Sequence, residues 1–168
     1  MTAESNGGPI ALRPAWKLSN PKIAEDAKAF WKRLGVLSTA EAERRISELC
    51  AAAYSGETLI GLATAYLESS ETLRSRVAHF RCLVAPSEGR NETVRALAVL
   101  SRDLLEQWSR DNPQEEVMAM AATIPTNAYP DIRGEPVWAE GGLNLNLVGY
   151  SRAGEQLRVS WFGHARVV

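Results

Sequence analysis

A chain of 168 residues is long enough for one domain with a two- or three-layer core. Its hydrophobic fraction of 45% and charged fraction of 23% are typical of an ordinary soluble globular protein. A formal net charge of −1 argues against nucleic acid or an anionic membrane surface as the main partner. The opening "MTAESNGGP" is polar, and no apolar run has the length of a membrane span, so we expect a cytoplasmic protein that contacts no membrane.

The cysteines and histidines predict no metal site. Cys50 in "ELCAAAY" and Cys82 in "HFRCLVA" lie in apolar, strand-like settings, which favours reduced core thiols over a disulfide or a metal pair. The chain has only two histidines, and they lie far apart in the sequence, so a zinc site is not expected.

The first third of the chain predicts two helices. Residues 1–9 are polar, and we expect them to be frayed. The apolar positions of residues 19–35 recur at helical spacing; Ser19 or Asn20 can cap this helix, and Gly35 can end it. Residues 39–49, "TAEAERRISEL", are charged and predict a short helix that leads into a strand.

Strands follow this helical region. Residues 49–69 predict two strands joined by a turn at residues 55–57. The alternation of residues 76–85 predicts a long strand with one wholly apolar face and one half-polar face that carries His79 and Arg81. Pro86 ends this strand.

The second half predicts a parallel crossover and a final hairpin. Residues 91–112 have one apolar stripe and form the clearest helix, and residues 115–124 follow as a buried strand. Strand, helix and strand of these lengths favour a right-handed parallel connection. Residues 125–142 carry three prolines and three glycines, which predicts a long irregular segment. Residues 143–167 predict a hairpin around residues 152–154, so the whole chain, 1–168, is interpreted as one domain.

This order of elements, together with the turn in "LVAPSEGRNETVRAL", resembles the GNAT acetyltransferase family over about residues 10–168. In that family the long strand ends in a pattern such as V-x-P, followed by Q/R-x-x-G-x-G/A and an apolar helix. Residues 84–86 match the first part, and Val94, Ala96 and Leu97 can continue it. The resemblance implies an α+β fold with a central mixed sheet, a parallel crossover helix and helices on both faces. An unrelated α+β protein is the interpretation left if the parallel crossover is absent.

The middle of the motif departs from the family pattern. Without gaps, Gly89 takes the Arg/Gln position, and Glu92 and Val94 take the two glycine positions; a shift of one residue would place Arg90, Thr93 and Arg95 there. A helix N-terminus attracts phosphate through its backbone, and this attraction survives the loss of glycine. A carboxylate at Glu92 would repel a diphosphate, whereas arginines at 90 and 95 could counter that charge.

The resemblance implies acetyl-CoA as co-substrate and direct attack by an amine of a small molecule or peptide on the thioester. It implies no covalent enzyme intermediate. The cofactor-binding residues that it places in this chain are Leu83, Val84, Gly89, Arg90, Asn91, Glu92, Thr93, Val94, Arg95 and Asn127. The alternative is a catalytically inactive GNAT-like domain that binds acyl-CoA as a sensor or serves as a protein-interaction module.

Three residues are candidates for acid–base chemistry. His79 lies on the polar face of the long strand, and an imidazole with an ordinary pKa of about 6.5 suits proton removal near neutrality. Glu68, near the end of the preceding strand, is an alternative base. The family commonly places a tyrosine acid after the fifth strand, where "TIPTNAYPDI" supplies Tyr129 beside Asn127. The alternatives are a packed His79, a solvated Glu68, a loop anchor at Tyr129 and a turn residue at Asn127.

Two further predictions concern the end of the chain. Trp138 lies in the irregular segment and is a candidate wall of a substrate pocket, whereas His164 is interpreted as a surface or edge-strand residue. The terminal "VSWFGHARVV" is apolar enough for its strand edge to pair with a second copy, which predicts a homodimer through the C-terminal hairpin.

Overall fold

The computed structural model describes residues 8–87 and 89–167; the expectation of frayed residues 1–9 therefore falls mainly outside the described residues. In this part of the chain, eight strands form one sheet in the order β1-β2-β3-β4-β5-β8-β7-β6. The strands are β1 (Ile10–Pro14), β2 (Leu49–Ser55), β3 (Thr58–Ser70), β4 (Ser75–Val84), β5 (Val117–Ile124), β6 (Val137–Trp138), β7 (Leu145–Tyr150) and β8 (Gln156–Trp161). The α-helices are α1 (Pro21–Leu34), α2 (Thr39–Arg45) and α3 (Arg90–Asp111).

The first two helices begin where their sequences place a capping group. The Asn20 side chain accepts a hydrogen bond from the backbone N–H of Ile23, which settles the choice between Ser19 and Asn20. Gly35 ends α1 with a φ of 64°, a conformation that glycine adopts without steric cost. Ser38 and Glu41 form a reciprocal capping box at the start of α2.

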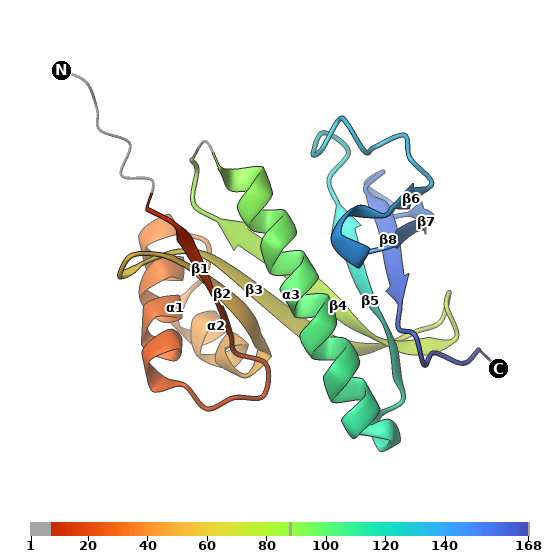
Figure 1. The fold of residues 1–168 in the computed structure, drawn as a ribbon, viewed down its shortest axis with the longest axis horizontal. Helices are drawn as coiled ribbons and strands as arrows, with labels where there is room; N and C mark the ends of the chain where they lie inside the picture. Colours follow the sequence, from red (N-terminus) through yellow and green to blue (C-terminus); the bar gives the residue numbers. More distant parts are fainter. Residues whose placement is uncertain (1–7, 88, 168) are drawn as a thin grey trace.

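The crossover between β4 and β5 is the central feature of the topology. β4 and β5 pair in parallel, and α3 connects them across one face of the sheet (Figure 1). The other strand pairs in the described sheet are antiparallel. The parallel connection predicted from the sequence is therefore confirmed. Because this crossover is present, the interpretation as an unrelated α+β protein is wrong.

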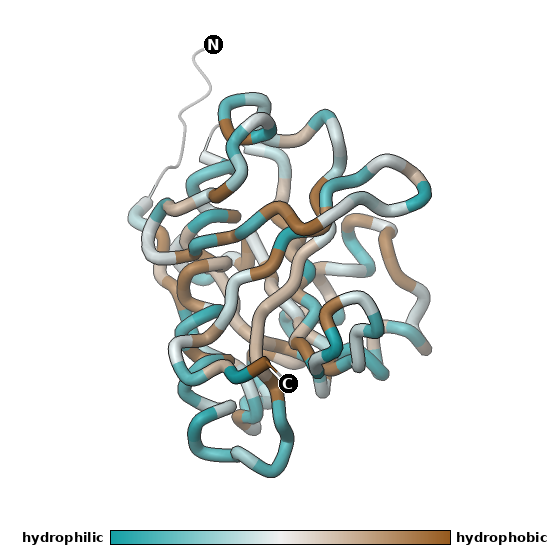
Figure 2. Tube along the Cα trace, turned by 90° about the vertical axis from the view of Figure 1, so that its right-hand side faces the viewer, coloured by the Kyte–Doolittle hydropathy of each residue, from teal (hydrophilic) through white to brown (hydrophobic). Residues whose placement is uncertain are grey.

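Helices cover both faces of the sheet, as expected for this fold class. Leu97 and Leu105 of α3 pack into one core with Phe80 of β4, while Phe30 and Trp31 of α1 pack into a second core on the opposite face. α3 lies close to the sheet at Gly61, where an added Cβ would meet Cδ1 of Leu97 in α3 at 3.1 Å. Figure 2 shows that hydrophilic residues predominate in the outer turns, with hydrophobic residues along the segments between them.

Two features at the sheet edges differ from the sequence predictions. β1 was not predicted; it is exposed along its whole length and pairs with β2 at one edge of the sheet. In the C-terminal hairpin, β8 pairs on both sides, with β5 and with β7. The terminal strand therefore has no free edge for a second copy, and the outer strand of the hairpin is β7. This corrects the site of the predicted dimer contact, because the final strand inserts beside β5 instead of following β7 at the edge.

No described helix is long and apolar enough to cross a membrane. Within the same residues, no cluster of three or more His, Cys, Asp or Glu side chains is arranged to hold a metal ion.

Candidate active site in the split between β4 and β5

A cavity opens where the two parallel strands separate. β4 and β5 pair only as far as Phe80 and Ala122, but β4 continues to Val84 and β5 to Ile124. The cavity at this split has a volume of about 640 Å³, within the usual range of ligand pockets. Phe80 and Met120 line it from the α3 side, and His79 and Thr123 line it from the opposite face of the sheet. The cavity therefore reaches both faces of the sheet.

Among the described residues, the split also leaves part of the β4 edge without a strand partner. The N–H of Ala85 donates to the carbonyl of Ile60, and the antiparallel register of β3 and β4 runs without a shift from this point to Ser75. Alternate residues of β4 then direct their backbone groups away from β3. By this alternation the N–H and C=O groups of Cys82 and Val84 point toward the split. Both residues line the cavity, so it offers backbone hydrogen-bonding groups as well as apolar walls.

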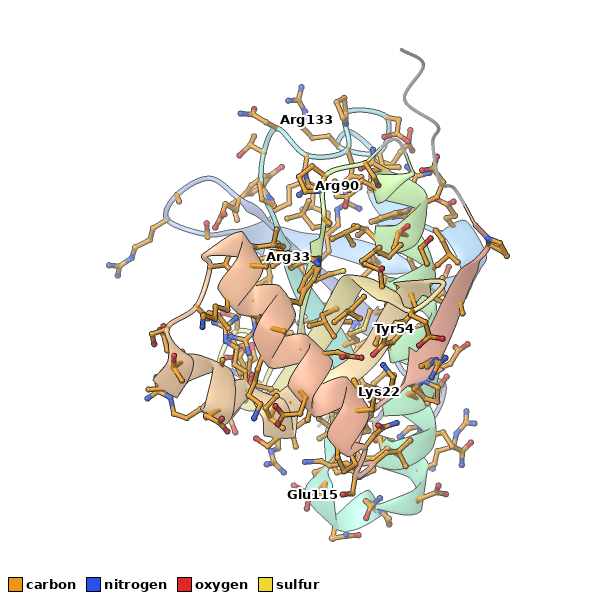
Figure 3. All side chains as sticks on the ribbon, turned by 90° about the vertical axis from the view of Figure 1, so that its left-hand side faces the viewer. Lys22, Arg33, Tyr54, Arg90, Glu115 and Arg133 are labelled. Atoms are coloured by element: carbon orange, nitrogen blue, oxygen red, sulfur yellow. The ribbon has the colours of Figure 1, made fainter. Side chains whose placement is uncertain are left out.

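The turn after Pro86 leads into the N-terminus of α3 without a side-chain cap. Gly89 is the N-cap residue, and no side chain among the described residues hydrogen-bonds there as a cap. The Thr93 hydroxyl donates instead to the carbonyl of Gly89, at 2.9 Å, within its own helix. Arg90 lies at this end of α3 (Figure 3) and lines the cavity. The helix N-terminus thus keeps the property that favours an anion, and an arginine stands beside it.

Only some of the predicted cofactor-binding residues line the cavity. Val84, Arg90 and Val94 line the cavity. Leu83 packs against the core on the α1 side, so its side chain faces away from α3. The remaining residues do not line the cavity: Gly89, Asn91, Glu92 and Asn127 are exposed, and Thr93 is buried.

Arg95 is held away from the turn by the irregular segment. Its Nη2 lies 2.9 Å from Oδ2 of Asp131, and its Nε lies 3.4 Å from Oε2 of Glu140. Its guanidinium also lies over the Trp138 ring, 5.7 Å from the centroid. Arg95 therefore fastens residues 131–140 to α3, which leaves Arg90 as the arginine of the predicted set that lines the cavity.

The two candidate bases lie together on neighbouring strands. Nδ1 of His79 is 3.0 Å from Oε1 of Glu68, and the His79 ring stacks on Tyr66 with centroids 5.0 Å apart. Because a carboxylate only accepts, this contact requires a proton on Nδ1, and the tautomer that meets this requirement keeps a lone pair on Nε2. Oγ1 of Thr123 lies 3.4 Å from Nε2, on the β5 side of the split. His79 is therefore oriented with its basic nitrogen toward the cavity.

Tyr129 lies across the cavity in an unusual backbone conformation. Its φ is 52°, in the left-handed region that non-glycine residues seldom adopt. Its ring packs against Trp138 with centroids 5.6 Å apart, and both residues line the cavity. Burial, and to a lesser degree the Cys82 thiol, raises the pKa of the Tyr129 phenol, so this group keeps its proton at neutral pH.

A buried arginine holds the irregular segment in place. Arg158 of β8 is fully buried and donates to the carbonyls of Ile132, Glu135 and Leu145, at 3.3, 2.7 and 3.1 Å. Gln156 accepts from Arg158 and donates to the carbonyl of Arg133 at 2.7 Å. Burial lowers the pKa of the Arg158 guanidinium, which remains charged at neutral pH. These bonds fix the segment that carries Tyr129 and Trp138.

Sequence reasoning missed several residues of the cavity. Tyr66, Arg81, Thr123 and Glu155 line it but were not predicted as site residues. The register of β3 and β4 places Tyr66 opposite His79, and neither strand shows this pairing in its own sequence. His164, interpreted as a surface or edge residue, lies outside this site; its Nε2 is 2.8 Å from the buried Ser109 hydroxyl.

Known proteins resemble this chain in structure and not in sequence. A scan against protein-family models and a search of curated proteins find no match. The acetyltransferase of the GNAT family from Streptococcus pneumoniae is 13% identical, with a TM-score of 0.58 over 92% of this chain and 99% of its own. NAA60 from Arabidopsis thaliana, solved in complex with acetyl-CoA, is 14% identical, with a TM-score of 0.59 over 90% and 98%. Aminoglycoside 6'-acetyltransferase type Ii is 13% identical, with a TM-score of 0.53 over 90% and 96%. The chain has the GNAT fold.

Proposed function

We propose that this protein is an N-acetyltransferase that moves an acetyl group from acetyl-CoA to an amine of a small molecule or peptide. The observation that carries the proposal is the cavity in the split between β4 and β5. It runs from Arg90 at the N-terminus of α3 to His79 on the opposite face of the sheet. One site can therefore hold a phosphate-bearing acyl donor on one side and present a base to an acceptor on the other.

The residues present fit acetyl-CoA. The free backbone groups of Cys82 and Val84 can pair with the amides of an extended pantetheine chain, as a strand edge pairs with a peptide. Arg90 and the uncapped N-terminus of α3 suit the pyrophosphate. Phe80, Met120 and other apolar side chains supply a dry wall. When bound, acetyl-CoA supplies an acetyl group activated as a thioester.

His79 and Tyr129 supply the proton transfers in this proposal. In the net reaction an N–C bond forms at the acceptor nitrogen, and the thioester C–S bond breaks. Nε2 of His79 accepts the proton that the nitrogen loses, and Glu68 stabilises the resulting imidazolium through Nδ1–H. The Tyr129 phenol, kept protonated by its raised pKa, donates a proton to the departing sulfur. Thr123 orients Nε2.

Thermal denaturation with acetyl-CoA tests the proposal. Acetyl-CoA at one hundred times its Kd stabilises the folded state by about 2.7 kcal/mol, which raises the Tm of a protein of this size by about 5–10 °C. Desulfo-CoA and adenosine are the matched ligands that show whether the whole donor is recognised. An unchanged Tm at millimolar acetyl-CoA contradicts the enzyme proposal. Binding without acetyl transfer to any amine supports the alternative, a GNAT-like module that binds acyl-CoA.

Three accompanying proposals concern the protein as a whole. We propose one domain over residues 1–168 and a homodimer in which the end of β7 beyond its pairing with β6 meets a second copy. Tyr150 at this end is 64% exposed, and Val148, two residues before it, is 37% exposed. The cytoplasmic location stays a prediction; both cysteines are free thiols, in keeping with it.

A further inference from the structure

A second pocket adjoins the cavity on the α1–α2 side of the sheet. It has a volume of about 230 Å³ and shares Arg81 and Cys82 with the larger cavity. Its lining residues come from α1, α2, the connection between these helices, and strands β3 and β4. Its apolar wall consists of Trp31, Val36, Leu37, Leu62 and Leu83. This space is enough for one hydrophobic side chain of leucine or phenylalanine size.

Two arginines give this pocket an excess of positive charge. Arg45 of α2 and Arg81 of β4 both line it. Glu48 forms an ion pair with Arg81, and no carboxylate among the described residues lies within ion-pair distance of Arg45. The Glu41 carboxylate, one turn away on α2, is engaged in the capping box with Ser38. The pocket therefore holds two guanidinium groups and one neighbouring carboxylate.

The arginines also have hydrogen-bonding capacity to spare. Nε of Arg81 is buried and has no hydrogen-bond partner among the described residues, a state that buried donors rarely keep. Burial, and then the nearby Arg81 guanidinium, lowers the pKa of Arg45. A bound anion would satisfy the unpaired donor and relieve the repulsion between the two cations.

Tyr66 connects this charged pocket to the candidate base. The His79 ring stacks on Tyr66, and the Arg81 guanidinium lies 4.6 Å from the centroid of the same ring. His79 and Arg81 are two residues apart on β4 and point to the same side of the sheet. An acceptor with its amine at His79 can therefore place an adjacent anionic group at Arg81 and Arg45.

We propose that the acceptor is a free apolar α-amino acid of leucine or phenylalanine size, bound through its carboxylate by Arg45 and Arg81. The side chain of the acceptor packs against the apolar wall formed by Trp31, Leu37 and Leu62. Its amine faces Nε2 of His79. This inference rests on the proposed acetyltransferase function. The same two arginines repel polycationic acceptors such as aminoglycosides, and a peptide N-terminus has no carboxylate at the required place.

An acceptor panel tests this substrate class. L-leucine and L-phenylalanine are compared with leucinamide, phenylalaninamide and a neutral leucyl peptide by CoA release and by the mass of the product. We expect kcat/KM for leucine to exceed that for leucinamide about tenfold or more, because one charge-assisted contact is lost in the amide. Equal or faster reaction of the amide or the peptide overturns the proposal. Aminoglycoside acetylation as the main activity overturns it as well.

Arg45→Gln and Arg44→Gln form a matched pair of variants. Both remove one charge from α2, but Arg44 is exposed and does not line the pocket. Arg45→Gln should raise KM for leucine about tenfold, leave leucinamide unaffected, and leave the Tm shift with acetyl-CoA unchanged. Arg44→Gln should change none of these values. If Arg45→Gln slows the acetylation of leucine and of leucinamide equally, the proposed contact between Arg45 and the acceptor carboxylate is wrong.

Leucine binding can be measured without acetyl transfer, so the substrate class and the proposed function can be tested separately. Leucine alone should raise the Tm of the wild-type protein and not that of Arg45→Gln. If leucine binds in this way but acetyl-CoA does not, the result supports an amino-acid site in this pocket and contradicts the acetyltransferase proposal. If acetyl-CoA binds and the apolar amino acids neither bind nor react, the substrate class is wrong and the proposed function stands.

Discussion

Oε1 of Glu68 on β3 lies 3.0 Å from Nδ1 of His79 on β4, and this contact fixes the orientation of the imidazole. The two residues were alternative candidates for one role in the sequence, but the structure joins them as a pair. The His79 side chain is 15% exposed and that of Glu68 is 40% exposed, so the carboxylate remains partly in solvent while the ring faces the cavity. In the proposed mechanism Glu68 is accordingly a positioning residue, and His79 is the candidate base.

His79→Gln should lower kcat about 10²–10⁴-fold, the usual contribution of a positioned general base. Glutamine keeps a hydrogen-bonding side chain of similar size but cannot take up a proton at neutral pH. The KM for acetyl-CoA should change little, because the CoA-facing residues of the cavity are untouched. Steady-state kinetics with the best acceptor of the panel give both values. A kcat within twofold of wild type would assign the proton transfer to another group.

Glu68→Gln should have a smaller effect, about tenfold on kcat. The amide can still accept from Nδ1–H but does not stabilise a positive ring. Steady-state kinetics with the same acceptor measure this change. A kcat equal to that of the wild type would show that Glu68 only packs beside the ring.

Glu92→Gln should increase the affinity for acetyl-CoA about two- to fivefold at low salt. Glu92 is exposed in the first turn of α3, where its carboxylate would repel a diphosphate bound at the same end of the helix. The gain should shrink above about 0.5 M salt, because exposed charges are screened. Calorimetric titration at two salt concentrations measures both effects. Asp111→Asn, which removes a carboxylate at the other end of α3, should leave affinity unchanged; an equal gain there would indicate a net-charge effect.

The sequence predicted the regular elements well, because their signals are local. The caps, the hairpin turns and the stripe of α3 each lie within a few consecutive residues. β1 gave no such signal, because "IALRP" is exposed along its length and ends in a proline. The two-residue β6 is too short for any periodicity.

The site was harder to predict because it depends on the register and on the place where two strands part. Neither β4 nor β5 reveals in its own residues that pairing stops at Phe80 and Ala122. His79 and Glu68 were found separately, but their contact follows from the alignment of β3 with β4. Arg158 was missed because charged residues are seldom fully buried, and nothing in "QLRVSW" shows that loop carbonyls surround it.

Arg158→Met should destabilise the protein and free the irregular segment. The methionine leaves the carbonyls of Ile132, Glu135 and Leu145 without their donor, at a cost of about 3 kcal/mol and about 6–12 °C in Tm. Limited proteolysis with mass spectrometry should show faster cleavage within residues 125–142. Arg152→Met, an exposed arginine in the β7–β8 turn, is the control and should change stability by less than about 0.5 kcal/mol. Unchanged cleavage in Arg158→Met would contradict the anchoring role.

Glu106 should make the stability of the fold depend on pH in the acidic range. Burial alone would raise the pKa of this carboxyl, but the N–H of Gly163 and the guanidinium of Arg102 outweigh it and hold the pKa below the ordinary value of 4.5. Gly163 N lies 2.6 Å from Oε1, and Arg102 Nη1 lies 2.7 Å from Oε2. Glu106 thereby fastens the segment after β8 to α3.

A carboxyl with a depressed folded-state pKa binds fewer protons in the folded state than in the unfolded state. Its contribution is therefore complete above pH 4.5 and is lost as the pH falls through the folded-state value. Glu106→Gln should lower the free energy of unfolding by about 1–2 kcal/mol at pH 7. The gap from wild type should narrow as the pH falls from 4.5 toward 3, because the wild-type carboxyl takes up a proton as the pH falls through its folded-state pKa. Urea denaturation at both pH values measures it, with Glu57→Gln in the exposed β2–β3 turn as the control. A gap of constant size from pH 7 to pH 3 would mean that the Glu106 contacts do not depend on its charge.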